Sequence, residues 1–160
     1  MEVFVSGKRL RLKPQQAIGK GGEADVFAIG NDQALKLFKP PSHPDYAGQP
    51  HEQQQAQARL AEHQAKLPAF PGHVPRRVVR PETLVTDRTG QTILGYTMRF
   101  LHGTTVLMRY AERSFRQAGV GHATVVAIFR DLYHTLCTLH PCRAIRWHLS
   151  SARPGTQGAA

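Results

Sequence analysis

Short runs that alternate apolar and polar residues, separated by turn residues, occupy the first forty positions of the chain. Runs of this kind lie at residues 3–5, 10–12, 15–18, 25–29 and 33–39. An alternation with a period of two predicts half-buried strands, and Gly30-Asn31-Asp32 is typical of a tight turn between them. Residues 82–86 and 91–100 repeat the pattern around a turn at 87–90. These short connections predict an antiparallel sheet.

Three other segments have the composition or the spacing of helices. Residues 51–67 are dense in good helix formers and are followed by Pro68, and residues 104–118 read as one helix that ends at Gly119. Apolar residues recur at helical spacing within 122–139. Residues 141–160 have little periodicity and are predicted to be a disordered or non-homologous tail. The fold class expected is therefore α+β.

Composition and charge set the broad class. The chain has 160 residues, of which 41% are hydrophobic and 20% are charged, as in a globular protein. No apolar run approaches the roughly 20 residues that a membrane-spanning helix needs, so we expect a cytoplasmic protein with no membrane partner. The net charge of +10 would attract polyanions in general, so a basic nucleic-acid-binding protein is an open alternative.

Metal-ligating residues are scattered. His134 and His140 lie six positions apart, which does not fit one helical face, and Cys137 and Cys142 have no further ligands nearby. No metal site is predicted.

Glycines and a lysine form the most informative pattern. Gly19, Gly21 and Gly22 separate two predicted strands, so few side chains would keep a phosphate from the backbone N–H groups of the turn. Lys36 lies within the next strand but one, between Leu35 and Leu37. Its ammonium group would point either into a cleft under the glycine turn or to solvent.

The segments GKGGEADV and ALKLF resemble the glycine-rich loop and the strand-three lysine segment of the protein kinase family. The similarity is to the bacterial serine/threonine kinase-like group, some members of which carry helix-hairpin-helix segments. In that pattern Gly19, Gly21 and Ala24 take the three glycine positions. The resemblance also implies that Val26 packs over the adenine and that Ala34 lines the same pocket.

The resemblance extends to the acidic partner of the lysine and to the hinge. Glu62, which shares a helical face with Ala58 and Ala65, would pair with Lys36, and Glu52 is the alternative. GYTMRFLHG is similar to the fifth strand and the hinge, with Met98 as the gatekeeper. The resemblance thus implies a nucleotide site made of Ile18, Gly19, Lys20, Gly21, Gly22, Glu23, Ala24, Val26, Ala34, Lys36, Glu62, Met98, Arg99, Phe100 and Leu101.

The family's fold gives the expected organisation. Residues 1–101 would form a kinase-like small lobe with about five antiparallel strands and one helix. Residues 102–140 would be the first two helices of an incomplete large lobe, and 141–160 the tail. In the full fold the helix at 122–139 is buried, so here we expect it to meet a protein partner or to self-associate.

The resemblance implies ATP as the cofactor but no complete catalytic apparatus. After Leu139-His140 the sequence contains no Asp, Glu or Asn, so the family's catalytic aspartate, its asparagine and its metal-binding aspartate have no counterparts. No catalytic residue is assigned, and Mg²⁺ is expected only in an intact homologue. Phosphoryl transfer to protein hydroxyls is therefore expected of such a homologue and not of this chain, which would be a truncated or frame-shifted form. A pseudokinase-like module that binds a nucleotide or a partner is the alternative.

Overall fold

The computed structural model describes residues 1–139, and these divide into two compact units. The first unit comprises residues 1–70 and 79–102. Residues 71–78 belong to the second unit, together with the chain from Gly103 onward. The tail predicted at 141–160 lies outside the described residues.

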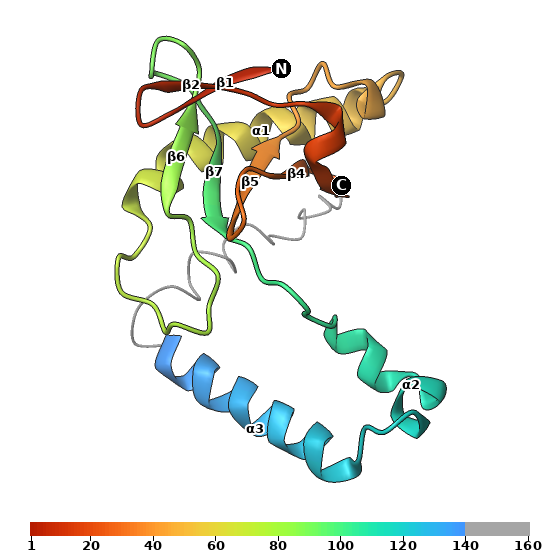
Figure 1. Cartoon of the computed structure of the whole chain (residues 1–160). Helices are drawn as coiled ribbons and strands as arrows, with labels where there is room; N and C mark the ends of the chain where they lie inside the picture. Colours follow the sequence, from red (N-terminus) through yellow and green to blue (C-terminus); the bar gives the residue numbers. More distant parts are fainter. Residues whose placement is uncertain (140–160) are drawn as a thin grey trace, which may run out of the picture. The chain divides into compact units, whose positions relative to one another are not determined.

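One antiparallel sheet, curled and seven-stranded, forms the body of the first unit (Figure 1). The strands are β1 (Glu2–Val5), β2 (Lys8–Arg11), β3 (Ala17–Lys20), β4 (Ala24–Ala28), β5 (Gln33–Phe38), β6 (Thr83–Thr86) and β7 (Ile93–Arg99). Their order across the sheet is β2-β1-β6-β7-β5-β4-β3. Each predicted strand has a counterpart, and the mixed α and β class is confirmed. The strand expected at 15–18 is displaced: Pro14–Gln16 form a 3₁₀ helix, and β3 begins only at Ala17. The sheet has more strands than the expected five because the β1–β2 hairpin pairs with β6 and extends it.

Turn residues close the hairpins as the sequence predicts. Ser6 and Gly7 have φ of 48° and 75°, the left-handed conformation that a two-residue hairpin loop requires. At the β4–β5 turn the amide of Ile29 donates to the carbonyl of Gln33 over 3.0 Å. The β1–β2 and β4–β5 hairpins are therefore fixed in register by local chemistry.

The core lies on one face of the sheet. Leu35 and Leu37 of β5 are 0% and 6% exposed and belong to a buried cluster that also contains Val3, Leu12, Phe27 and Val85. Because side chains alternate along a strand, Lys36 points to the opposite face. Leu35 and Leu37 thus face the core, whereas Lys36 lines a cleft on the other face.

Gly95 of β7 allows β5 and β7 to approach closely. A Cβ atom at this position would lie 2.0 Å from the carbonyl oxygen of Lys36 and 3.1 Å from the Cα of Leu37. Only a residue without a side chain fits there. The strand that carries Lys36 is consequently held tightly in the middle of the sheet.

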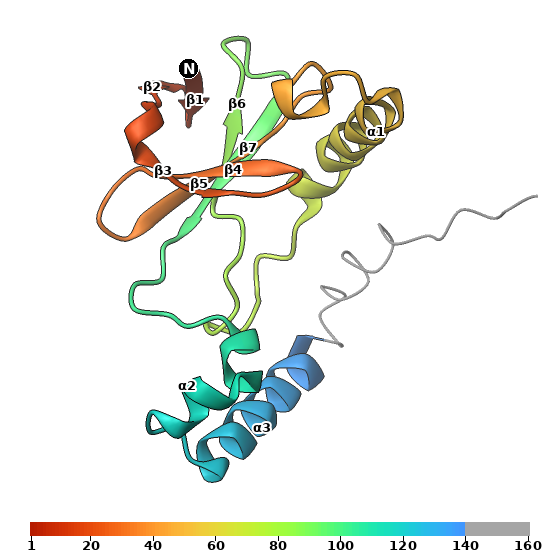
Figure 2. The same ribbon diagram turned by 90° about the vertical axis from the view of Figure 1, so that its right-hand side faces the viewer.

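The helix α1 (Pro50–Lys66) lies beside β5 and β7 in both views (Figures 1 and 2). Gln64 fixes it to the start of β7, since its side chain both donates to the carbonyl of Ile93 (2.8 Å) and accepts from the amide of Ile93 (2.7 Å). Ala56 is buried, whereas Ala58 and Ala65 are exposed. The two alanines that share a helical face with Glu62 are thus not packed against the sheet, because the helix packs through the adjacent face that contains Ala56.

The second unit contains α2 (Arg113–Gln117) and α3 (His122–Leu139). The single helix predicted at 104–118 is wrong: a 3₁₀ helix at Leu107–Ala111 and α2 are separated by Glu112, whose φ of −71° and ψ of 126° are extended. Residues 104–106 are β-branched, and this disfavours a helix start there. Gly119, with φ of 122°, ends the segment as predicted.

The predicted helix at 122–139 is present as α3, and several of its apolar side chains are exposed. These are Val126, Phe129, Leu132, Tyr133 and Leu136. Among the residues that the structure describes, every helix is too short or too polar to cross a lipid bilayer.

Candidate functional site

A cleft of about 530 Å³ lies between the glycine turn and the middle strands of the sheet. Its lining consists of Gly19, Lys20, Gly21, Gly22, Glu23, Ala24, Val26, Lys36, Tyr96 and Met98. The sheet register explains how strands from distant parts of the sequence meet here. Val26 pairs with Lys36, and Lys36 pairs with Tyr96, so these side chains form a row on the face opposite the core.

Lys36 contributes an ammonium group to this cleft. Its Nζ atom lies 6.0 Å from the centroid of the Tyr96 ring, at the outer limit of a cation–π contact. Burial raises the pKa of the Tyr96 hydroxyl, so that ring stays neutral at physiological pH. The cleft therefore combines a cation with an apolar and aromatic wall.

Glu62 makes an ion pair with Lys66, one turn further along α1. Within residues 1–139 no ion pair joins Glu62 to Lys36, so the role expected for Glu62 stays a prediction. Glu52, the alternative, lies in the first turn of α1.

The next residue of α1, His63, is influenced by the charge of the cleft lysine. The pKa of His63 is lowered, first by burial and then by the positive charge of Lys36. An imidazole that is held neutral does not repel the ammonium group. His63 was not predicted from the sequence, because the family pattern points to a carboxylate on this helix.

Several other predicted residues surround the cleft without lining it. Ala34 is 1% exposed and pairs with Met98, so it supports the cleft from the strand beneath. Ile18 is 46% exposed and lies at a register irregularity in β3, between the pairs Ala17–Phe27 and Gly19–Val26. Such a bulge explains why Ile18 turns away from the neighbouring positions.

The segment predicted as a hinge follows directly on β7. Arg99 ends the strand, and the amide of Phe100 donates to the carbonyl of Asp32 over 2.8 Å. This amide is thus already used within the protein. Leu101 is 40% exposed. The hinge residues therefore lie at the Met98 end of the cleft, and their role in binding stays a prediction.

Lys39 is a second lysine near the glycine turn, and sequence analysis did not identify it. It is 4% exposed, and its Nζ donates to the carbonyl of Gly21 (2.6 Å) and to Asp45 (2.5 Å) and lies 3.6 Å from Asp25. The hydrogen bond with Asp45 raises the pKa of Lys39, and the same bond lowers the pKa of Asp45. The lysine is accordingly charged, as a buried ammonium between two carboxylates should be.

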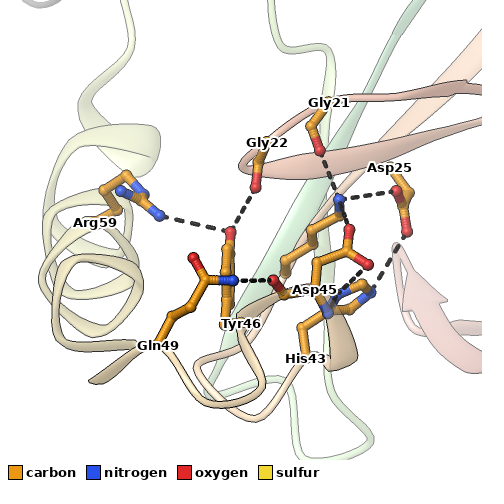
Figure 3. Close-up of polar contacts among 9 residues, drawn as sticks. Gly21, Gly22, Asp25, His43, Asp45, Tyr46, Gln49 and Arg59 are labelled. Atoms are coloured by element: carbon orange, nitrogen blue, oxygen red, sulfur yellow. Dashed lines mark hydrogen bonds and ion pairs between the residues drawn. The ribbon is translucent and has the colours of Figure 1, made fainter. Parts of the chain in front are cut away.

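The short 3₁₀ helix Pro44–Tyr46 carries the other half of this arrangement (Figure 3). The hydroxyl of Tyr46 donates to the carbonyl of Gly22 over 2.6 Å, and the Arg59 guanidinium donates to the same hydroxyl over 3.5 Å.

One feature of the sequence points to the role of Lys39. Lys39 continues the alternating, core-facing series of Leu35 and Leu37, and an unpaired charge at such a position would be costly.

Comparisons of the chain with protein-family models, with curated proteins and with solved structures found no match.

Proposed function

We propose that this protein binds a nucleotide, with ATP as the expected ligand, in the cleft between the glycine turn and strands β4, β5 and β7. The observation that carries the proposal is that Lys36 and the glycine turn line the same cleft. A glycine turn offers backbone N–H groups and a lysine offers a positive charge, and a polyphosphate needs both.

The two ends of the cleft suit the two ends of a nucleotide. Lys20 and Lys36 supply positive charge beside Gly21 and Gly22. Val26, Met98 and the Tyr96 ring supply apolar surface on which a base can lie. This division of the cleft supports binding of the whole nucleotide, with the phosphates at the turn.

We assign the chain to the protein kinase-like family as part of the same proposal. Its support is the order of the parts along the chain. The glycine turn leads into β4, β5 carries Lys36 and β7 carries Met98, and these three strands are antiparallel neighbours in the sheet. The sequence has no counterparts for the catalytic aspartate and the metal-binding aspartate after residue 139. The proposed activity is therefore binding, and phosphoryl transfer is assigned only to an intact homologue.

Calorimetric titration with ATP, with and without Mg²⁺, tests this function. We expect saturable binding in the upper micromolar range, because the glycine turn, Lys36 and the apolar wall would hold the ligand without family metal ligands. Lys36→Met should reduce the affinity at least tenfold by removing the charge in the cleft. Lys8→Met, at an exposed position of β2, is the matched control and should leave binding unchanged.

Two results would contradict the proposal. One is the absence of saturable ATP binding to the unaltered chain. The other is an ATP affinity that is equal in Lys36→Met and the unaltered protein, once circular dichroism has shown that both are folded. Binding to duplex DNA that falls steeply with salt and does not depend on Lys36 would favour the nucleic-acid alternative.

A further inference from the structure

Two side chains that do not line the cleft hold two consecutive carbonyl groups of the glycine turn. The ammonium of Lys39 donates to the carbonyl of Gly21, and the hydroxyl of Tyr46 donates to the carbonyl of Gly22, each over 2.6 Å. Figure 3 shows both contacts and the residues that surround them. A turn of glycines has many accessible conformations, and these two bonds select among them.

The direction of the first carbonyl follows from the sheet. Asp25 and Val26 are neighbours on β4, so their side chains point to opposite faces. Val26 lines the cleft, so Asp25 is on the other face, and the ammonium group of Lys39 lies 3.6 Å from the Asp25 carboxylate. The carbonyl of Gly21 therefore points away from the cleft.

The amide that follows must point the other way. In a trans peptide the C=O of one residue and the N–H of the next lie on opposite sides, and residues 1–139 contain no cis peptide. The N–H of Gly22 is thus turned toward the cleft. Within the described residues, the backbone hydrogen bonds of the turn run from the amide of Gly21 to the carbonyl of Ala24 and from the amide of Lys39 to the carbonyl of Glu23. Neither of these bonds involves the amide of Gly22, which is therefore available to a ligand.

The groups behind the turn are themselves held in place. Tyr46 is 5% exposed, and its backbone carbonyl accepts from the side chain of Gln53 over 3.1 Å. Arg59 of α1 contacts both the Tyr46 hydroxyl and, over 3.6 Å, the carboxylate of Glu23. Positioning residues need such support if they are to fix a binding group within a fraction of an ångström.

We infer that Lys39 and Tyr46 are positioning residues that orient the glycine turn so that the Gly22 amide receives a phosphate group. This inference rests on the proposed nucleotide site and adds the residues that prepare it. Neither residue lines the cleft, so neither is placed to touch the ligand. Their effect is confined to the phosphate end of the nucleotide.

Tyr46→Phe is the test because it removes one hydroxyl and keeps the buried ring. We expect a three- to tenfold loss of affinity for ATP, the usual consequence of one lost hydrogen bond. The affinity for adenosine, which has no phosphate, should not change. Tyr133→Phe, at an exposed position of α3, is the matched control and should bind both ligands as the unaltered chain does.

A second measurement reports on the turn without any ligand. In ¹⁵N relaxation experiments the amides of Gly21 and Gly22 should be more mobile in Tyr46→Phe than in the unaltered chain, whereas Tyr133→Phe should show no change. Equal mobility in Tyr46→Phe and the unaltered chain would overturn the inference. So would an equal loss of affinity for ATP and adenosine, because a structural defect would weaken both.

The experiment separates this inference from the function on which it rests. If the unaltered chain binds ATP and Tyr46→Phe binds it equally well, only the positioning role fails. If the unaltered chain does not bind ATP, the proposed function fails, and the phosphate-orienting role fails with it.

Discussion

The imidazole ring of His63 is stacked on the phenyl ring of Phe38, with ring centroids 4.1 Å apart and planes inclined by 14°. Phe38 ends β5, so this contact joins α1 to the strand that carries Lys36. The stack places an ionisable ring in a partly buried position beside a lysine. Its protonation state is consequently linked to the stability of the fold.

Stability should fall on mild acidification because of His63. The pKa of His63 is lower in the folded protein, so the unfolded chain binds the proton more readily. His63 therefore makes its full contribution to the free energy of unfolding above the ordinary histidine pKa, about 6.5. This contribution declines as the pH falls through the lower pKa of the folded state. Urea unfolding between pH 7.5 and 5 measures this decline. His63→Gln should make the unfolding free energy less dependent on pH. The control His122→Gln, at an exposed position, should leave the pH dependence unchanged. An unchanged pH dependence in His63→Gln would contradict the prediction.

Strong acid should weaken the ion pair behind the glycine turn. The hydrogen bond from Lys39 lowers the pKa of Asp45, so this carboxylate stabilises the fold above its ordinary pKa and ceases to do so as pH falls through the lower folded value. Asp45→Asn should flatten the decline in thermal midpoint below about pH 4. The control is Asp32→Asn, whose carboxylate is 87% exposed. An identical decline in Asp45→Asn and the unaltered chain would argue against this pair as a source of acid sensitivity.

Gly95→Ala should destabilise the sheet severely. The added methyl group would overlap the carbonyl oxygen of Lys36, and a backbone atom in the middle of a sheet cannot move aside. We expect a loss of about 2 kcal/mol or more in the free energy of unfolding, which urea denaturation measures. Gly121→Ala has open space around the new Cβ and should cost less than about 0.5 kcal/mol. Comparable stability of the two variants would contradict the close approach of β5 and β7.

Leu35→Ala should cost about 2 to 5 kcal/mol in the free energy of unfolding, because it leaves a cavity at a fully buried position. Leu101→Ala removes the same atoms from a side chain that is 40% exposed and should cost clearly less. Denaturant unfolding of both variants provides the comparison. A smaller loss in Leu35→Ala than in Leu101→Ala would place the core elsewhere.

The strands could be predicted from the sequence because their signals are local. Alternation of apolar and polar residues and the glycine and asparagine turns act within a few positions, and five strands follow them between Glu2 and Phe38. The exception is Pro14–Gln16, a 3₁₀ helix where the alternation predicts the start of a strand. The helix at 104–118 could not be predicted correctly, since good helix formers there compete with β-branched residues and with an extended Glu112. Local propensity alone does not decide such a segment.

Of the candidate site, the residues that face the cleft could be predicted from the sequence. The glycines and Lys36 lie within short segments whose spacing is informative, and they line one cleft. Lys39, Asp45 and Tyr46 do not line the cleft, and their contacts with the turn and with each other depend on how the loop after β5 folds back. Tertiary contacts of this kind have no periodic signature. The partner of Lys36 likewise depends on the rotation of α1, and that rotation turns Ala58 to solvent.

The position of β5 between β4 and β7 has a consequence for biosynthesis. On the ribosome, β4 and β5 emerge as a hairpin while β7 has still to be translated, so one edge of β5 stays open in the nascent chain. Leu35 and Leu37 lie on that strand, and an open apolar edge is a site of aggregation. Chaperone capture of ribosome-bound intermediates should consequently end once Ile93–Arg99 has left the exit tunnel and closed the sheet.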